Sequence, residues 1–140
     1  MKRIHYILII ILIALAFLVI FDFTTSNLTS NTYNLPDDYE LLENNSGNLT
    51  FSNGKNQIIL FELDDNFSID TYMEHFSDRY NITVEDFSLN EHVKKTVTTE
   101  GNATVAVKYW FNKNNESYQI HVSRNDYELD QIVNEMILNI

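Results

Sequence analysis

The chain has no cysteine, one proline, three glycines and only nine lysines and arginines among its 140 residues. Without cysteine it cannot form disulfides, thiol nucleophiles or cysteine–zinc sites, so its stability must come from packing. With so few glycines it contains no phosphate-cradling loop, and it has no G-x-S-x-G nucleophile elbow. These absences remove several classes of enzyme.

Cations are scarce relative to anions. Nine Lys and Arg stand against 20 Asp and Glu, which gives a formal net charge of −11. Lys2 and Arg3 lie at the start of the chain, so the remainder is more acidic still. Binding to nucleic acid requires clustered cations that displace counterions from phosphate, and we exclude nucleic acid as a partner. A solubilising surface accounts for the acidity without a bound cation.

One stretch, Ile4 to Phe21, is almost continuously apolar. A helix of this length spans about 27 Å at about 1.5 Å per residue, close to the hydrocarbon thickness of a bilayer. A helix buried in a domain core is the poorer explanation, because this run has no polar stripe. We predict a transmembrane anchor at residues 1–23, a flexible tether at 24–34 and a folded domain at 35–140.

A cleaved signal peptide is the alternative to an anchor. Its apolar core is usually about 7–15 residues long and ends at a small-residue cleavage site. In this chain the run is longer and leaves through Phe21, Asp22 and Phe23. Lys2 and Arg3 before the run favour a cytoplasmic N-terminus. We therefore expect a single-pass protein in the cell membrane, with its C-terminal domain outside the cytoplasm.

Asparagine is abundant in the exported part, and Asn-x-Ser/Thr acceptors for N-glycosylation are more frequent than composition alone predicts. Compositional bias in an Asn-rich chain is the alternative explanation. The seven candidate sites are Asn27, Asn44, Asn48, Asn66, Asn81, Asn102 and Asn115.

The pattern of residues 35–140 predicts strands and helices joined by short turns. Asn53-Gly54 predicts a tight hairpin whose two central residues both have positive φ. A helix is expected over Ser68–Tyr80 and another from Asn125 or Asp126 to Ile140, each with an apolar stripe at helical period. Strands are expected around 49–51, at 57–63, at 82–87 as a short segment, and at 92–99, 103–111 and 117–123. The fold class is α+β: an antiparallel sheet with two amphipathic helices packed on it, preceded by the transmembrane helix.

This order of elements resembles the PsbP-like fold, which comprises small extracytoplasmic α+β domains related to an extrinsic photosystem subunit. The resemblance rests on Leu35-Pro36-Asp37-Asp38-Tyr39, the hairpin at Asn53-Gly54, Lys108-Tyr109-Trp110-Phe111, Tyr118-Gln119-Ile120 and the closing helix from Asp126. It implies an accessory or binding domain and transfers no catalytic residues.

The sequence contains no recognisable motif for binding a metal or a cofactor. His75, His92 and His121 lack the spacing that places two ligands on one helix face. Asp64 begins a stretch like a calcium loop, but position 6 is Ile69 in place of glycine and position 12 is His75 in place of glutamate. We expect no metal site, no cofactor and no catalytic residue.

Aromatic residues on two neighbouring strands are the candidate binding surface. Tyr109, Trp110 and Tyr118 form the predicted recognition patch. Trp110 alternates with Tyr109 along its strand, so this residue either packs beneath a helix, which we favour, or forms part of the exposed patch.

These features predict a membrane-tethered extracytoplasmic binding or accessory domain that is not an enzyme. Its expected partners are the membrane, through the N-terminal helix, and a protein complex of the membrane or cell surface. One alternative is a hydrolase-type enzyme with a site assembled from scattered Asp, Glu and His. Another is a pilin-like surface subunit, although the polar tether interrupts the helix that such a subunit continues into its head.

Overall fold

The computed structural model describes residues 32–45, 47–64 and 67–140. They form one seven-stranded antiparallel sheet with two helices, so the α+β fold class is confirmed. The predicted anchor and nearly all of the predicted tether lie outside the described residues, and neither described helix is long and apolar enough to cross a bilayer. The elements are β1 Glu40–Asn45, β2 Asn48–Ser52, β3 Gln57–Leu63, α2 Ile69–Phe76, β4 Asn81–Asp86, β5 Lys94–Glu100, β6 Ala103–Lys113, β7 Glu116–Val122 and α3 Tyr127–Asn139.

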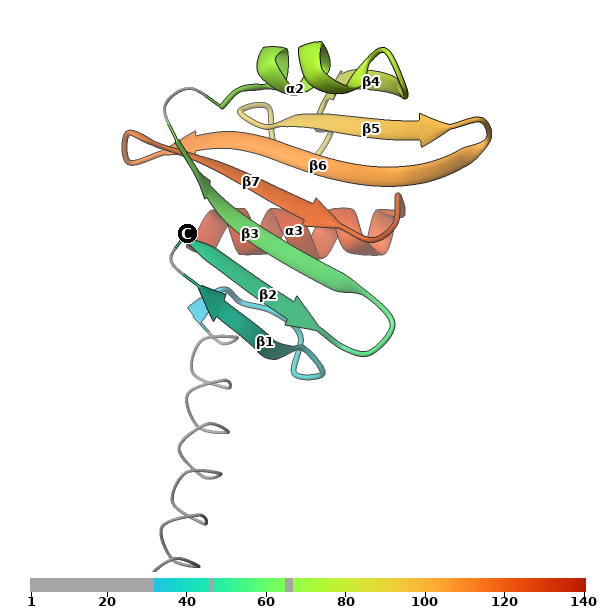
Figure 1. Ribbon diagram of the computed structural model, residues 1–140. Coiled ribbons are helices and arrows are strands. Elements are labelled where there is room, and N and C mark those ends of the chain that lie inside the picture. Colours follow the sequence, from blue (N-terminus) through green and yellow to red (C-terminus); the bar gives the residue numbers. More distant parts are fainter. Residues whose placement is uncertain (1–31, 46, 65–66) are drawn as a thin grey trace, which may run out of the picture.

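The sheet consists of two meanders joined side by side. The strand order is β1-β2-β3-β7-β6-β5-β4, so β3 pairs with β7 and α2 carries the chain from β3 to the far edge at β4. In Figure 1, α3 lies across β3 and β7, whereas α2 lies beside β4 and β5 at one end of the sheet. β1 and β4 are the two edge strands.

The two helices lie against opposite faces of the sheet. Along β6, Val107 and Tyr109 are buried in the core that α3 covers. Lys108, which lies between them in the sequence, contacts the ring of Tyr72 in α2. Trp110, the residue after Tyr109, also contacts the ring of Tyr72. Successive side chains of a strand point to opposite faces, so this alternation assigns each helix to its face.

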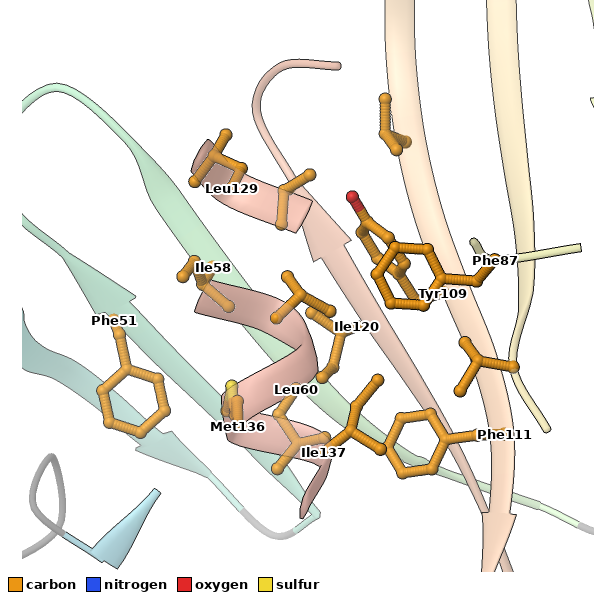
Figure 2. Close-up of a cluster of buried hydrophobic side chains, with 14 of the residues drawn as sticks. Phe51, Ile58, Leu60, Phe87, Tyr109, Phe111, Ile120, Leu129, Met136 and Ile137 are labelled. Carbon is orange, nitrogen blue, oxygen red and sulfur yellow. The ribbon is translucent and has the colours of Figure 1, made fainter. Parts of the chain in front are cut away.

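The main core fills the space between α3 and the sheet. Figure 2 shows side chains of the helix meeting those of the strands and of Phe87. Four residues of the predicted stripe on α3 are buried, and Ile132 and Ile140 pack beside them. Each fully buried aliphatic side chain stabilises the fold by about 1.5–3 kcal/mol, so this face holds most of the stability. The buried helix residues are Leu129, Val133, Met136 and Ile137.

α2 is shorter and more weakly buried than α3. The predicted cap Ser68 accepts a hydrogen bond from the backbone N–H of Thr71, but the helix ends at Phe76 and not at Tyr80. Tyr72 is its one buried residue, and Phe76 is 41% exposed. The predicted apolar stripe is therefore only partly covered by the sheet.

The hairpin turns differ in detail from the prediction. β2 and β3 form the expected hairpin, but in its turn only Gly54 has a positive φ, of 79°. The side chain of Asn53 instead accepts hydrogen bonds from the backbone N–H groups of Lys55 and Asn56. A turn with two positive φ angles occurs between β6 and β7, at Asn114 and Asn115. The predicted geometry at Asn53-Gly54 is thus wrong, although the hairpin is confirmed.

The head begins slightly earlier than predicted. The ring of Tyr33 contacts Phe51 edge-on at 5.8 Å between centroids, and the amide of Asn34 donates to Glu135 on α3 at 3.2 Å. Both residues fall in the predicted tether of residues 24–34. Tyr33 and Asn34 therefore contact the head, although both precede the predicted boundary at residue 35.

Candidate functional site

The predicted recognition patch is not assembled as one exposed surface. Tyr109 is 0% exposed and lies in the core under α3. Trp110 is 6% exposed and lies on the opposite face, whereas Tyr118 is half-buried on β7. Neighbours on a strand point to opposite faces, so no single partner can contact both Tyr109 and Trp110.

Tyr109 belongs to a buried polar cluster that joins α3 to the sheet. Its hydroxyl donates to the carboxylate of Asp130, which also pairs with Lys95 Nζ at 2.8 Å. The side chains of Lys95 and Asp130 are 6% and 13% exposed. Burial, and then the bond to Asp130, raises the pKa of Tyr109. The cluster has the partners it needs without a ligand, which favours a structural role.

Trp110 lies beneath α2, which is the alternative that its alternation with Tyr109 left open. Its ring stacks on Phe67 at 5.9 Å and lies 5.6 Å from Tyr72, which in turn lies 5.0 Å from Phe76. Its indole N–H donates to the hydroxyl of Thr96 at 3.0 Å. Phe67 and Phe76 are more than a third exposed, so this row of rings reaches the surface at both ends.

A pair of basic residues beside this row, Lys108 and His121, was not predicted from the sequence. Lys108 Nζ lies 4.1 Å from the ring centroid of Tyr72, and no described carboxylate is within ion-pair distance of it. Burial lowers the pKa of Lys108. His121 lies directly opposite on β7, and burial, then the charge of Lys108, lowers its pKa also. On the same strand as His121, the amide nitrogen of Gln119 is buried without a hydrogen-bond partner in the described structure.

The three histidines of the described head, His75, His92 and His121, are not gathered into a metal site. His75 lies on exposed α2, where its Nδ1 contacts the carbonyl oxygen of Thr71, and His92 is exposed in the loop before β5. Within residues 32–45, 47–64 and 67–140, no group of three His, Asp or Glu side chains is placed to hold a metal ion. At the start of the calcium-like stretch, the backbone N–H of Phe67 donates to the carbonyl of Asp64 at 2.9 Å, just before the cap of α2.

One open hollow lies at the end of the sheet where the described chain begins. It has a volume of about 490 Å³ and is lined by β1, β2, β3, β7, the end of α3 and the residues before Asn34. Four asparagines lie around it; the strand register puts the side chain of Asn44 on the α3 face and those of Asn45 and Asn48 on the other face. We call it the amide hollow; those asparagines are Asn44, Asn45, Asn48 and Asn139.

A second hollow, of about 330 Å³, lies between the start of α2 and the end of the β6–β7 hairpin. It is lined by aromatic rings, among them Phe67 and Trp110, and by the side chains of His92 and Lys94. Tyr118 lines both hollows. Of the three predicted patch residues, Tyr118 is therefore the one that faces both open spaces.

Five of the predicted N-glycosylation sites fall within the described residues. Asn44 and Asn81 are exposed on the two edge strands, and Asn102 and Asn115 are exposed in hairpin turns. Asn48 is half-buried on β2. Asn27 and Asn66 lie outside the described residues. The four exposed sites have room for a glycan, and their modification stays a prediction.

Comparison with known proteins adds no assignment: no family model, no curated protein and no solved structure matches this chain. The resemblance to the PsbP-like fold therefore stays a prediction, and function has to be argued from the residues of this chain.

Proposed function

We propose that this protein is a membrane-tethered binding or accessory domain that acts outside the cytoplasm and has no catalytic activity. The apolar run from Ile4 to Phe21 anchors it as a transmembrane helix. Lys2 and Arg3 hold the N-terminus on the cytoplasmic side. The head, from Tyr33 onward, is presented on the other side.

The apolar run carries this proposal, and the build of the head supports it. The core between α3 and the sheet is formed by residues from Leu35 to Ile137. α3 already covers this face of the sheet, so the core needs no further apolar helix. A run of about 18 apolar residues that the head does not need for its own packing is best accommodated by a bilayer.

The two hollows favour binding over catalysis. Acid–base catalysis uses a positioned side chain, most often His, Asp or Glu, whose pKa is tuned by burial and neighbours. Glu62 is the one carboxylate side chain among the described residues that line the amide hollow. In the second hollow the side chains of His92 and Lys94 are 85% and 53% exposed, so neither is held in a desolvated site. Amides, rings and aliphatic side chains make up most of the remaining described lining, as in a ligand pocket.

Protease protection tests the proposal directly. The full chain would carry one epitope tag at each terminus and be expressed in its native host. We expect both tags in the membrane fraction, with the C-terminal tag digested by protease added to intact cells and the N-terminal tag digested only after detergent. A soluble product, a cleaved N-terminal tag or the opposite pattern of protection would contradict the proposal.

A further inference from the structure

The amide hollow is chemically unlike the rest of this acidic molecule. Its four asparagines come from three elements, namely β1, β2 and α3, at one end of the sheet, and Asn44 and Asn139 are the two on the α3 side. Among the described residues that line it there is no lysine, arginine or histidine, and Glu62 is the one acidic side chain. Its volume of about 490 Å³ falls in the range of small-ligand pockets, which is about 300–1,000 Å³.

Several polar groups at this hollow are free to bind a ligand. The side chains of Asn44 and Glu62, which lie on the α3 face of the sheet with Leu49 and Tyr118, make no hydrogen bond to another described residue. Asn139 donates to the carbonyl of Glu135, which leaves its own side-chain oxygen as an acceptor. An amide both donates and accepts hydrogen bonds. Together these groups offer donors and acceptors to one neutral ligand.

Two tyrosines complete the lining. Tyr33 and Tyr118 both line the hollow, and one face of the Tyr118 ring stacks on Phe111 at 5.4 Å. Glu62 lies directly opposite Tyr118 in the pairing of β3 with β7, and Tyr33 lines the same hollow. Aromatic rings pack against the apolar C–H surface of a ligand while their hydroxyls bond to its polar groups.

From this lining we infer that the amide hollow binds a neutral, hydroxyl-rich ligand of the saccharide class. Each sugar hydroxyl both donates and accepts a hydrogen bond, as the amides do, and the ring C–H groups of a sugar suit Tyr33 and Tyr118. A phosphate or carboxylate ligand would meet Glu62 and no cationic side chain of the described lining. This inference rests on the binding function proposed above and names the ligand class for it.

The position of two glycosylation sequons sharpens the inference. Asn44 and Asn48 are both acceptor positions and both line the hollow. A glycan attached to Asn44, which points to the α3 face, would place its own sugars at this site and compete with a free saccharide. Binding must therefore be measured on protein made in a host that does not attach N-glycans.

The test uses the unglycosylated full chain in phosphatidylcholine nanodiscs, because many detergents carry sugar head groups. Saturation-transfer NMR would be recorded with maltotriose, cellotriose, tri-N-acetylchitotriose and, as an anionic comparison, trigalacturonate. We expect transfer to at least one neutral trisaccharide and weaker transfer to trigalacturonate. No transfer to any neutral trisaccharide, or a preference for trigalacturonate, would overturn the inference.

Variants locate the binding. Asn44→Leu and Glu62→Leu each remove an exposed polar side chain from the hollow, and Asn81→Leu makes the same change as Asn44→Leu on the other edge strand. Loss of one or two hydrogen bonds should weaken binding about tenfold in the first two variants and leave Asn81→Leu unchanged. Equal affinity in all three would place the sugar elsewhere and overturn the inference. The protease-protection result is independent of this outcome, so the proposed ligand class and the proposed membrane tether can be contradicted separately.

Discussion

Lys94 and Lys95 are neighbours on β5, and they show how differently the two faces of the sheet are built. Lys94 pairs with Asp86 at the surface, where the two side chains are 53% and 77% exposed. Lys95 points to the other face and pairs with Asp130 of α3, where the side chains are 6% and 13% exposed. The same residue type makes a solvated contact on one face and a buried anchor on the other.

The difference extends to the helices. α3 has 13 residues, of which four are buried, and Lys113 donates to the carbonyls of Ile137 and Leu138 at its end. α2 has eight residues and buries only Tyr72. We infer that the α3 face carries the stability of the head, whereas the α2 face is covered at one end and contributes less. Substitutions on the two faces should therefore lower the free energy of unfolding by different amounts.

The largest effect is expected for the buried ion pair. Asp130→Ala leaves Lys95 charged and buried, with Glu85 4.0 Å away as its remaining partner, and removes the acceptor of Tyr109. We expect a loss of about 3–5 kcal/mol in the free energy of unfolding, measured by urea denaturation. Asp86→Ala is the matched control on the other face and should lose less than about 1 kcal/mol. Equal losses would contradict the assignment of the two faces.

Truncating a core side chain should also destabilise the α3 face more than the α2 face, with a slightly smaller loss in the free energy of unfolding than for the ion pair. Leu129→Ala leaves a cavity beneath α3, where this residue is 0% exposed, and should cost about 2–5 kcal/mol. Phe76→Ala on α2 removes a ring that is already 41% exposed and should cost less than about 1.5 kcal/mol, since part of the ring stays in water before and after folding. Denaturation of the two variants gives the comparison, and a larger loss for Phe76→Ala would reverse it.

A buried hydrogen bond between side chains helps to hold α2 to the sheet. The hydroxyl of Tyr72 lies 2.8 Å from the hydroxyl of Thr98. Tyr72→Phe should cost about 1 kcal/mol and raise hydrogen exchange in α2 without changing that of α3. The fluorescence of Trp110, the one tryptophan of the chain, would report the same local loosening. Faster exchange throughout both helices would show that α2 is part of one cooperative unit with α3.

The smallest effect concerns alkaline pH. The bond from the Tyr118 hydroxyl to Glu116, and then burial, raises the pKa of Tyr118 from 10.0 to about 12. Because the folded protein favours the protonated hydroxyl of Tyr118, the contribution of this group to the free energy of unfolding is complete below pH 10.0. That contribution is lost as pH rises through about 12. Tyrosinate absorbance, compared with that of Tyr118→Phe, isolates this titration. Glu116→Gln should lower the pKa of Tyr118, and an unchanged value would show that Glu116 is not the cause of the shift.

Local patterns predicted most elements of the head. The helical stripe that includes Leu129 and Val133 predicted α3, and Asp126 caps it through the N–H of Leu129. Alternation along β6 separated its two faces correctly. β1 was missed because it is an edge strand with five exposed positions, where only Leu41 packs against the core. Such a strand has no apolar period that a sequence pattern can reveal.

The candidate site was less predictable than the fold. The patch at Tyr109, Trp110 and Tyr118 was wrong as a single surface, because α2 covers the opposite face from α3 and each helix buries one of the first two rings. An apolar stripe shows that a helix packs, but it does not show on which face. The amide hollow joins residues from Tyr33 to Asn139, which only the pairing of strands brings together.

The central claim is that the head folds by itself and that the apolar run serves as its anchor. The most direct test compares urea unfolding of residues 32–140 with unfolding of the head in the full chain held in nanodiscs, followed by Trp110 fluorescence. We predict a soluble fragment whose free energy of unfolding agrees within about 0.5 kcal/mol, because distant segments that share no contacts contribute independently. An unfolded or aggregated fragment would show that the run belongs to the fold and would contradict the claim.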